Sequence, residues 1–380
     1  MSRRIAILGA SGSVGSALAA HILRARLLEP QDQLLLVGHG VLATERKLLS
    51  MRVDLMDAFD QDRVRMEVVP DVSDVEADIV VVAAGTTATS GTQTRRDVAA
   101  TNRVIFEEIA DQCVTRLSEA LFIVVSNPVE LAVKIFSLAG DRNRVIGMGA
   151  QQDSLRFARA IAADLGVSRH NLQATVLGEH GEAMIPLWRS VELMTDDSRA
   201  TDHLDALRVR SAESPLRIRV AVLRTQVARL LSENRISEAY ALAQRALPDA
   251  RIFVEPNITV HGLHSTPNAT ANATLQVVAA ALANDRRRIH GQVDLRDEVL
   301  ELNGVCGIPV SIGKNGWNAE PLDWLQPDEI TAVQQSTQSI EQFISEILID
   351  AVRPTLPPDD ALFLEGQTLT AKEQQAIPTR

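Results

Sequence analysis

The sequence has few cysteines, few positive charges and no long apolar run, and each shortage argues against a class of protein. Its two cysteines, Cys113 and Cys306, have no Cys-x-x-Cys spacing, so neither a disulfide framework nor a zinc site is expected. The 38 Lys and Arg against 49 Asp and Glu give a net charge of −11, which disfavours nucleic acid and anionic membranes as partners. No stretch is apolar for long enough to cross a bilayer, and a strand follows Met1 too closely for a signal peptide. We therefore expect a cytoplasmic protein.

The N-terminal segment combines an apolar strand, a glycine-containing turn and a helix. In the stretch 5–23, Gly9 permits the tight turn, Gly12 leaves the backbone open to a pyrophosphate, and Gly15 allows close packing of helix on strand. Backbone N–H groups near Ser13 and Val14 would then face the phosphates. Because glycines also serve sharp turns structurally, this pattern alone is a weak indication of a dinucleotide site.

The second predicted strand, 33–37, ends at Gly38, where dinucleotide-binding folds usually place a carboxylate on the adenosine ribose. Without that charge a 2′-phosphate is not repelled, and His39 or Arg46 could approach it. The cofactor is therefore NAD or NADP. The alternative interpretation is that Gly38 is only a turn residue and that NAD binds through its other contacts.

Six strand-like runs in the first half alternate with helical patterns, which predicts an α/β fold with a doubly wound parallel sheet of the Rossmann type. A less regular second half predicts a mixed α+β substrate domain. We expect a dinucleotide-binding domain at 1–148, a catalytic domain at 149–352 with an inserted strand pair near 248–264, and a loosely held tail at 353–380.

Three groups in the middle of the chain point to proton transfer on a carboxylic acid. Asp153 and Arg156 are three residues apart and share a helix face. His180 lies between glycines after a strand, where its ring would be presented to a cleft. An Asp fixes the tautomer of a His and raises its pKa, and an Arg fork matches a carboxylate. Taken separately, each residue is more readily explained as a surface ion pair or a turn residue.

With these motifs in order along 4–350, the chain resembles the lactate/malate dehydrogenase family of NAD-linked 2-hydroxy-acid dehydrogenases. The matching segments are Gly9-Ala-Ser-Gly-Ser-Val-Gly15, Ala84-Gly85, Arg95-Arg-Asp97 with Asn102, Ser126-Asn-Pro-Val129, Asp153-Ser-Leu-Arg-Phe157, Gly178-Glu-His-Gly181 and 307–316.

The resemblance implies roles for the matching residues. His180 would be the acid/base, Asp153 would orient it, and Arg95 would close over the substrate on a loop and polarise its carbonyl. Arg156 would bind the substrate carboxylate, with Asn127 and Thr266 also in the substrate pocket. The residues implied on the cofactor are Gly9, Gly12, Ser13, Val14, Gly15, Gly38, Gly85, Asn102 and Ser126, and no metal is implied.

The loop 86–94 departs from the family pattern. Malate enzymes of the family place a second arginine there for the distal carboxylate, whereas this chain has Thr87, Ala88 and Thr89. A buried distal carboxylate without a cation is costly, so ordinary malate specificity is disfavoured, although Arg96 is a possible substitute. The threonines could instead hydrogen-bond a hydroxylated substrate.

Other classes of oxidoreductase need residues that this sequence does not have in the required spacing. The only tyrosine, Tyr240, has Gln244 where short-chain oxidoreductases need a lysine, and neither cysteine has the partner base of a nucleophile. A non-catalytic cofactor sensor or structural homologue stays as the alternative to a dehydrogenase. The resemblance also implies a homodimer or homotetramer.

Overall fold

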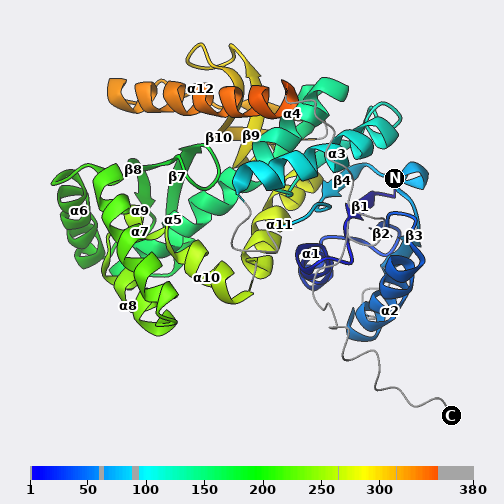
Figure 1. Cartoon of the computed structure of the whole chain (residues 1–380), viewed down its shortest axis with the longest axis horizontal. Coiled ribbons are helices and arrows are strands. Elements are labelled where there is room, and N and C mark those ends of the chain that lie inside the picture. Colours follow the sequence, from blue (N-terminus) through cyan, green and yellow to red (C-terminus); the bar gives the residue numbers. More distant parts are fainter. Residues whose placement is uncertain (1, 60–63, 88–93, 264, 314, 350–380) are drawn as a thin grey trace.

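The structure is a computed structural model that describes residues 2–59, 64–87, 94–263, 265–313 and 315–349. In its first half, strands alternate with helices as predicted (Figure 1). The strands are β1 (Arg4–Leu8), β2 (Gln33–Val37), β3 (Arg65–Val69), β4 (Ile79–Val82), β5 (Leu121–Val124) and β6 (Val145–Gly147). The helices are α1 (Ser13–Arg24), α2 (Leu42–Phe59), α3 (Arg95–Cys113), α4 (Val129–Ala139) and α5 (Gly149–Leu165).

These six strands form a parallel sheet in the order β3-β2-β1-β4-β5-β6, which confirms the predicted Rossmann arrangement. Residues 5–8 of β1 and 79–82 of β4 are buried on both sides of the sheet, as an apolar strand between two helical layers must be. The strand order reverses between β1 and β4. In such sheets a ligand binds at the carboxyl ends of the strands beside the reversal.

The second half continues the sheet with antiparallel strands. Its strands are β7 (Leu172–Gly178), β8 (Met184–Leu193), β9 (Arg288–Arg296), β10 (Asn303–Gly313) and β11 (Gly316–Ala319). Its helices are α6 (Ser198–Ala212), α7 (Leu216–Ser232), α8 (Ile236–Arg245), α9 (Pro248–Arg251), α10 (Glu255–Leu263), α11 (Pro267–Ala283) and α12 (Pro327–Ile349). β6 joins β9 through Gly147 and Gln292, and the order runs on through β10 and β7 to β8. The predicted mixed α+β character of this half is confirmed.

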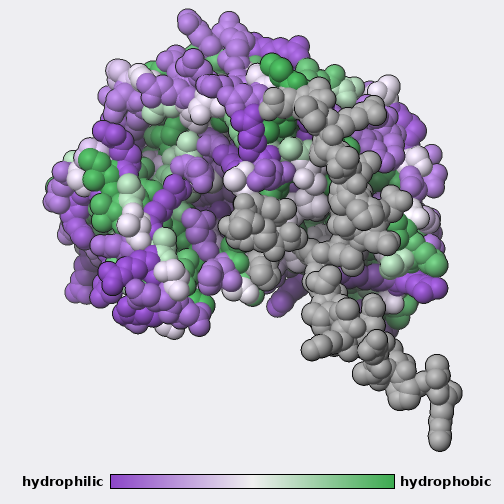
Figure 2. Space-filling model, viewed as in Figure 1, coloured by the Kyte–Doolittle hydropathy of each residue, from purple (hydrophilic) through white to green (hydrophobic). Residues whose placement is uncertain are grey.

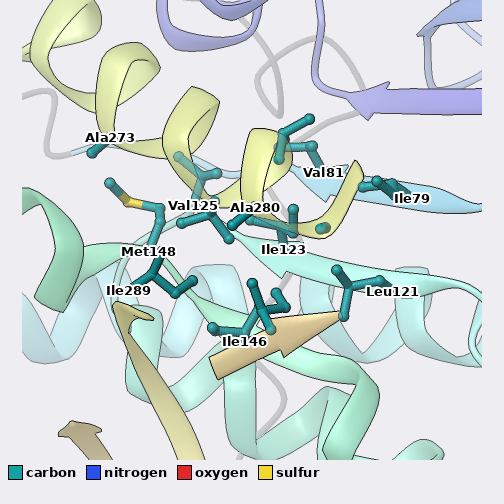
Figure 3. Close-up of a cluster of buried hydrophobic side chains, with 14 of the residues drawn as sticks. Ile79, Val81, Leu121, Ile123, Val125, Ile146, Met148, Ala273, Ala280 and Ile289 are labelled. Atoms are coloured by element: carbon teal, nitrogen blue, oxygen red, sulfur yellow. The ribbon is translucent and has the colours of Figure 1, made fainter. Parts of the chain in front are cut away.

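Helix α11 packs on the parallel sheet although it belongs to the second half of the chain. Its residues Ala273 and Ala280 lie in the same buried cluster as Val81 of β4 and Ile123 of β5 (Figure 3). Short alanine side chains let the helix approach the sheet closely. This shared core sets the N-terminal end of α11 beside the turn between β1 and α1, where Ser13 and Ser265 lie 3.2 Å apart through their Oγ atoms.

The strand pair expected within 248–264 is wrong, because the described residues of this segment form α9, a turn at 252–254, and α10. The apolar run that suggested strands is buried: Ile252, Phe253, Val254 and Ile258 are at most 6% exposed, in a cluster that includes Ile161 of α5. Pro248 stands in the first turn of α9, a position that suits a helix start. Packing against neighbouring helices therefore overrides the local strand propensity of this run.

The face drawn in Figure 2 is mostly hydrophilic, with apolar residues scattered among polar ones. Among the residues described, no helix is both long enough and apolar enough to cross a membrane. The predicted tail at 353–380 lies outside the described residues. The predicted domain boundary at residue 148 lies between β6 and α5 and stays a prediction.

Candidate active site

The turn between β1 and α1 has the shape that a pyrophosphate needs. Gly9 has φ of +77°, and a Cβ on it would lie 2.7 Å from the carbonyl oxygen of Ala83. Gly12 is the N-cap of α1, has no side-chain cap, and donates its N–H to Gly9 O at 3.0 Å. The first turn of α1 contains no acidic residue. The N–H groups of a helix start and the helix dipole therefore suit the phosphates of a dinucleotide at this turn.

At the end of β2 the structure shows what surrounds Gly38. A Cβ there would lie 2.9 Å from the carbonyl oxygen of Pro70, so a side chain is accommodated only with a shift. His39 hydrogen-bonds Thr44 at 2.8 Å, and burial holds the pKa of His39 below its usual range. A neutral His39 adds no positive charge for a 2′-phosphate. The choice between NAD and NADP stays open.

Asn102 and Ser126 tie together the loops at the carboxyl edge of the sheet. The fully buried amide of Asn102 accepts from the N–H of Thr86 at 2.7 Å and donates to the carbonyl oxygen of Asn127 at 2.6 Å. Ser126 Oγ donates to the carbonyl oxygen of Ala84 at 2.6 Å. A Cβ on Gly85, whose φ is +153°, would lie 3.3 Å from Asn102 Oδ1. These bonds hold the backbone around the predicted cofactor edge.

The structure brings His180, Asp153 and Arg156 together. Asp153, 1% exposed, receives His180 Nδ1 on Oδ2 at 2.7 Å and Arg156 Nη1 on Oδ1 at 3.1 Å. Burial lowers the pKa of His180, but the charge and hydrogen bond of Asp153 outweigh it and hold that pKa above its usual range. With Nδ1 bonded to Asp153, the Nε2 atom is the one available to exchange a proton.

Thr266, the predicted pocket threonine, lies next to Arg156. Arg156 Nη2 donates to Thr266 Oγ1 at 3.3 Å, and Gln152 Nε2 lies 3.2 Å from both Thr266 and Thr270. Burial lowers the pKa of Arg156 and the Asp153 charge opposes that effect; the guanidinium stays charged at neutral pH. This side of the site therefore offers one cation and several hydroxyl groups to a carboxylate.

Close packing at Gly149 makes room for the His180 ring. A Cβ on this first residue of α5 would lie 2.5 Å from Cγ and 2.9 Å from Nδ1 of His180. Real Cβ atoms do not come so near to a ring. The absence of a side chain at Gly149 is thus a condition for the His180 and Asp153 pair. Gly149 is not among the predicted site residues; its signal in the sequence is its place just beyond β6, separated from the end of that strand only by Met148.

Arg95 is the first residue of α3, and its guanidinium is held by its neighbours. The prediction placed it in a loop; instead the helix begins there, capped by Thr94 in a capping box with Asp97. The guanidinium hydrogen-bonds Glu179, lies 3.5 Å from Glu130 Oε2, and stands over the Phe343 ring at 5.1 Å. Residues 88–93 of the preceding loop, including Ala88 and Thr89, lie outside the described residues.

A cavity of about 300 Å³ opens between these groups. It is lined by Thr94, Arg95 and Val98 of the α3 start, by Asn127 and Pro128, and by His180, Gly181 and Glu182. The acid/base candidate and the Arg95 guanidinium thus share one cavity wall with the Asn127 turn. An oxygen atom placed in this cavity can meet a proton donor and a fixed positive charge together.

Glu130 and Glu179 are also part of the site, although neither is among the predicted site residues. Glu179 stands next to His180, and Glu130 follows the Ser126-Asn-Pro-Val129 segment. The signal for Glu130 was an acidic residue within the apolar sequence of α4, where an unpaired charge is unfavourable. Its partners, however, come from α3 and from the loop after β7, which the sequence alone does not place.

The chain is similar in sequence and in structure to known dehydrogenases. Residues 3–147 match the profile described as "lactate/malate dehydrogenase, NAD binding domain". The chain is 30% identical over 346 residues to malate dehydrogenase of Trichormus variabilis, covering 90% of this chain and 93% of that protein. It is 25% identical over 354 residues to L-2-hydroxycarboxylate dehydrogenase (NAD(P)(+)) of Methanocaldococcus jannaschii, covering 90% and 99%. The solved structure of the minor L-lactate dehydrogenase from Enterococcus mundtii matches with a TM-score of 0.70 at 20% identity, covering 91% and 98%.

Proposed function

Because this chain belongs to the lactate/malate dehydrogenase family, we propose that it transfers a hydride between NAD(P) and C2 of a small 2-hydroxy or 2-oxo acid, with His180 exchanging the proton. As a family member the chain is an NAD(P)-dependent dehydrogenase acting on a CH–OH group, and not a cofactor sensor without turnover. The observation that carries the residue assignment is the bonding of His180 and Arg156 to the same carboxylate, Asp153.

Each group has a task that follows from its contacts. In reduction, His180 Nε2 gives its proton to the substrate oxygen while Asp153 stabilises the imidazolium and fixes the ring. Arg156 binds the 1-carboxylate, with Thr266 at 3.3 Å from its Nη2. Arg95 polarises the carbonyl from the cavity wall. The bound nicotinamide supplies or accepts the hydride.

For the substrate, we propose a 2-oxo acid whose side chain carries no second carboxylate. Loop 86–94 contains no arginine, and Glu182 adds a negative charge to the cavity lining. Arg96, the possible substitute, bonds Glu346 of α12 at 3.1 Å, so a distal carboxylate would compete with that partner. Pyruvate and hydroxylated 2-oxo acids should therefore be better substrates than oxaloacetate.

We also propose a homodimer or homotetramer in the cytoplasm. Leu42, Leu49, Val53 and Met56 are between 41% and 58% exposed and are spaced along one side of α2. Such an apolar stripe is typical of a surface that a second copy covers. Light scattering coupled to gel filtration measures the number of subunits. The expected compartment rests on composition and stays a prediction.

The experiment that tests the function measures oxidation of NADH and of NADPH with pyruvate, oxaloacetate, and bulkier or hydroxylated 2-oxo acids. We expect turnover that favours an acid without a second carboxylate and that is lost in His180→Asn. Fluorescence titration of the same variant should show unchanged cofactor binding, because the proposed phosphate contacts come from the turn between β1 and α1. Turnover that survives in His180→Asn would refute the assignment of the acid/base. Preference for oxaloacetate would refute the substrate proposal.

A further inference from the structure

Glu130 is a buried carboxylate that contacts both catalytic side-chain systems of the cavity. It lies in the first turn of α4 and is 1% exposed. Its Oε1 accepts the backbone N–H of His180 at 2.6 Å. Its Oε2 is buried, has no hydrogen-bond partner within the described part of the chain, and lies 3.5 Å from Arg95 Nη2.

A buried carboxylate in this position lowers the stability of the fold. A buried charge loses its hydration, and a buried oxygen without a hydrogen bond adds to that cost. An Ala or Leu would suit the apolar sequence of α4 better, since Val129, Leu131, Ala132 and Val133 are fully buried around it. The free-energy cost of burying the Glu130 carboxylate is offset because the carboxylate lies between the His180 N–H donor and the Arg95 guanidinium. Both of these belong to residues of the proposed reaction.

We propose that Glu130 is a positioning residue that sets the His180 loop with one oxygen and the Arg95 guanidinium with the other. The inference rests on the proposed function, because it assigns Glu130 a part in the chemistry of His180 and Arg95. One carboxylate on a buried helix then fixes the separation of the proton donor and the positive charge. A guanidinium has five N–H donors, so Arg95 keeps Glu130 as a partner while it donates to a substrate oxygen.

Glu130 also acts on the charge of His180. The charged groups around this imidazole are Asp153 and Arg156 from α5 and Glu130 from α4. Arg95 of α3 and Glu182 line the same cavity, and Glu179, the residue before His180, pairs with Arg95. Among these, the Glu130 carboxylate favours the protonated ring, whereas the Arg156 guanidinium disfavours it. Removal of the Glu130 charge should therefore lower the pKa of His180.

The test is Glu130→Gln, which keeps the size of the side chain and an oxygen for the His180 N–H. Its amide NH₂ would face the Arg95 guanidinium, donor against donor, so Arg95 keeps Glu179 as its carboxylate partner but moves from its position beside residue 130. We expect kcat to fall about 10- to 100-fold, with little change in KM for the acid, because Arg156 is untouched. In cofactor-free protein, NMR titration should show the His180 ring losing its proton at a lower pH than in the wild type. The His180→Asn spectrum identifies the signal.

Two further variants separate charge from geometry. Glu130→Asp keeps the charge but is too short to reach both partners, so its His180 titration should stay close to the wild type while kcat falls. Glu119→Gln is a matched control, since Glu119 is 88% exposed and pairs with Arg144 at the surface; it should change neither readout. Wild-type kcat and an unchanged His180 titration in Glu130→Gln would overturn the inference. A wild type without turnover on any acid would instead overturn the proposed function, and the titration would still test the contact between Glu130 and His180.

Discussion

Replacement of Gly149 by alanine should disable the site while leaving the fold in place. The new Cβ would lie 2.5 Å from Cγ, 2.7 Å from Cβ and 2.9 Å from Nδ1 of His180. Ordinary contact begins near 3.4 Å, so the ring must move by about 1 Å. The 2.7 Å bond from His180 Nδ1 to Asp153 is the contact that this movement breaks.

The change in the free energy of unfolding is the sum of two opposing contributions. Alanine is a better helix former than glycine by up to about 1 kcal/mol, whereas overpacking costs about 1–3 kcal/mol. The free energy of unfolding should therefore fall by no more than about 3 kcal/mol. Displacement of a catalytic group by about 1 Å costs roughly 100-fold in rate, which equals about 2.7 kcal/mol of transition-state stabilisation.

The assay compares NADH oxidation, thermal unfolding and cofactor titration for Gly149→Ala with the same data for Gly262→Ala. Gly262 is a helical, exposed glycine of α10 with nothing within 4 Å of its Cβ position, so its variant should keep full activity. Wild-type activity in Gly149→Ala would refute the packing argument. Loss of activity together with global unfolding would show that the cost falls on the fold instead of on the His180 ring.

Three further predictions concern charge, core and surface. Asp153→Asn removes the charge that raises the pKa of His180. Because reduction of a 2-oxo acid needs the protonated ring, its rate should begin to decline at a lower pH than in the wild type, and kcat should fall about 100-fold. A pH–rate profile that keeps its position would contradict this prediction. Asp249→Asn breaks a buried pair with two 2.7 Å bonds to Arg219 and should lower the free energy of unfolding by about 3 kcal/mol, measured by urea titration against wild type. Val53→Glu puts a charge into the exposed stripe of α2 and should reduce the number of subunits in light scattering; an unchanged number would refute the assignment of this stripe as the interface.

Much of the parallel sheet could be predicted because its signals are local. β1, β2 and β4 are short apolar runs bounded by turn residues, and α1 and α5 have helical spacing with glycine at or next to their starts. A residue's neighbours in sequence are enough to indicate such elements. The segment 248–264 shows the limit of this reasoning. Its apolar run looks like a strand, but residues 252–254 form a turn that is buried against helices, and 255–263 form α10.

In the candidate site too, some features follow from local sequence and others depend on tertiary contacts. The pair Asp153 and Arg156 follows from helical spacing, and the glycine turn follows from backbone conformation, so the sequence by itself determined both. Three other features join residues from α3, α4, α5 and the loop after β7. They are the contact of His180 with Asp153, the space provided by Gly149, and the contact of Arg95 with Glu130. Only the tertiary structure decided these contacts, because each depends on distances between elements that close packing of the whole core fixes.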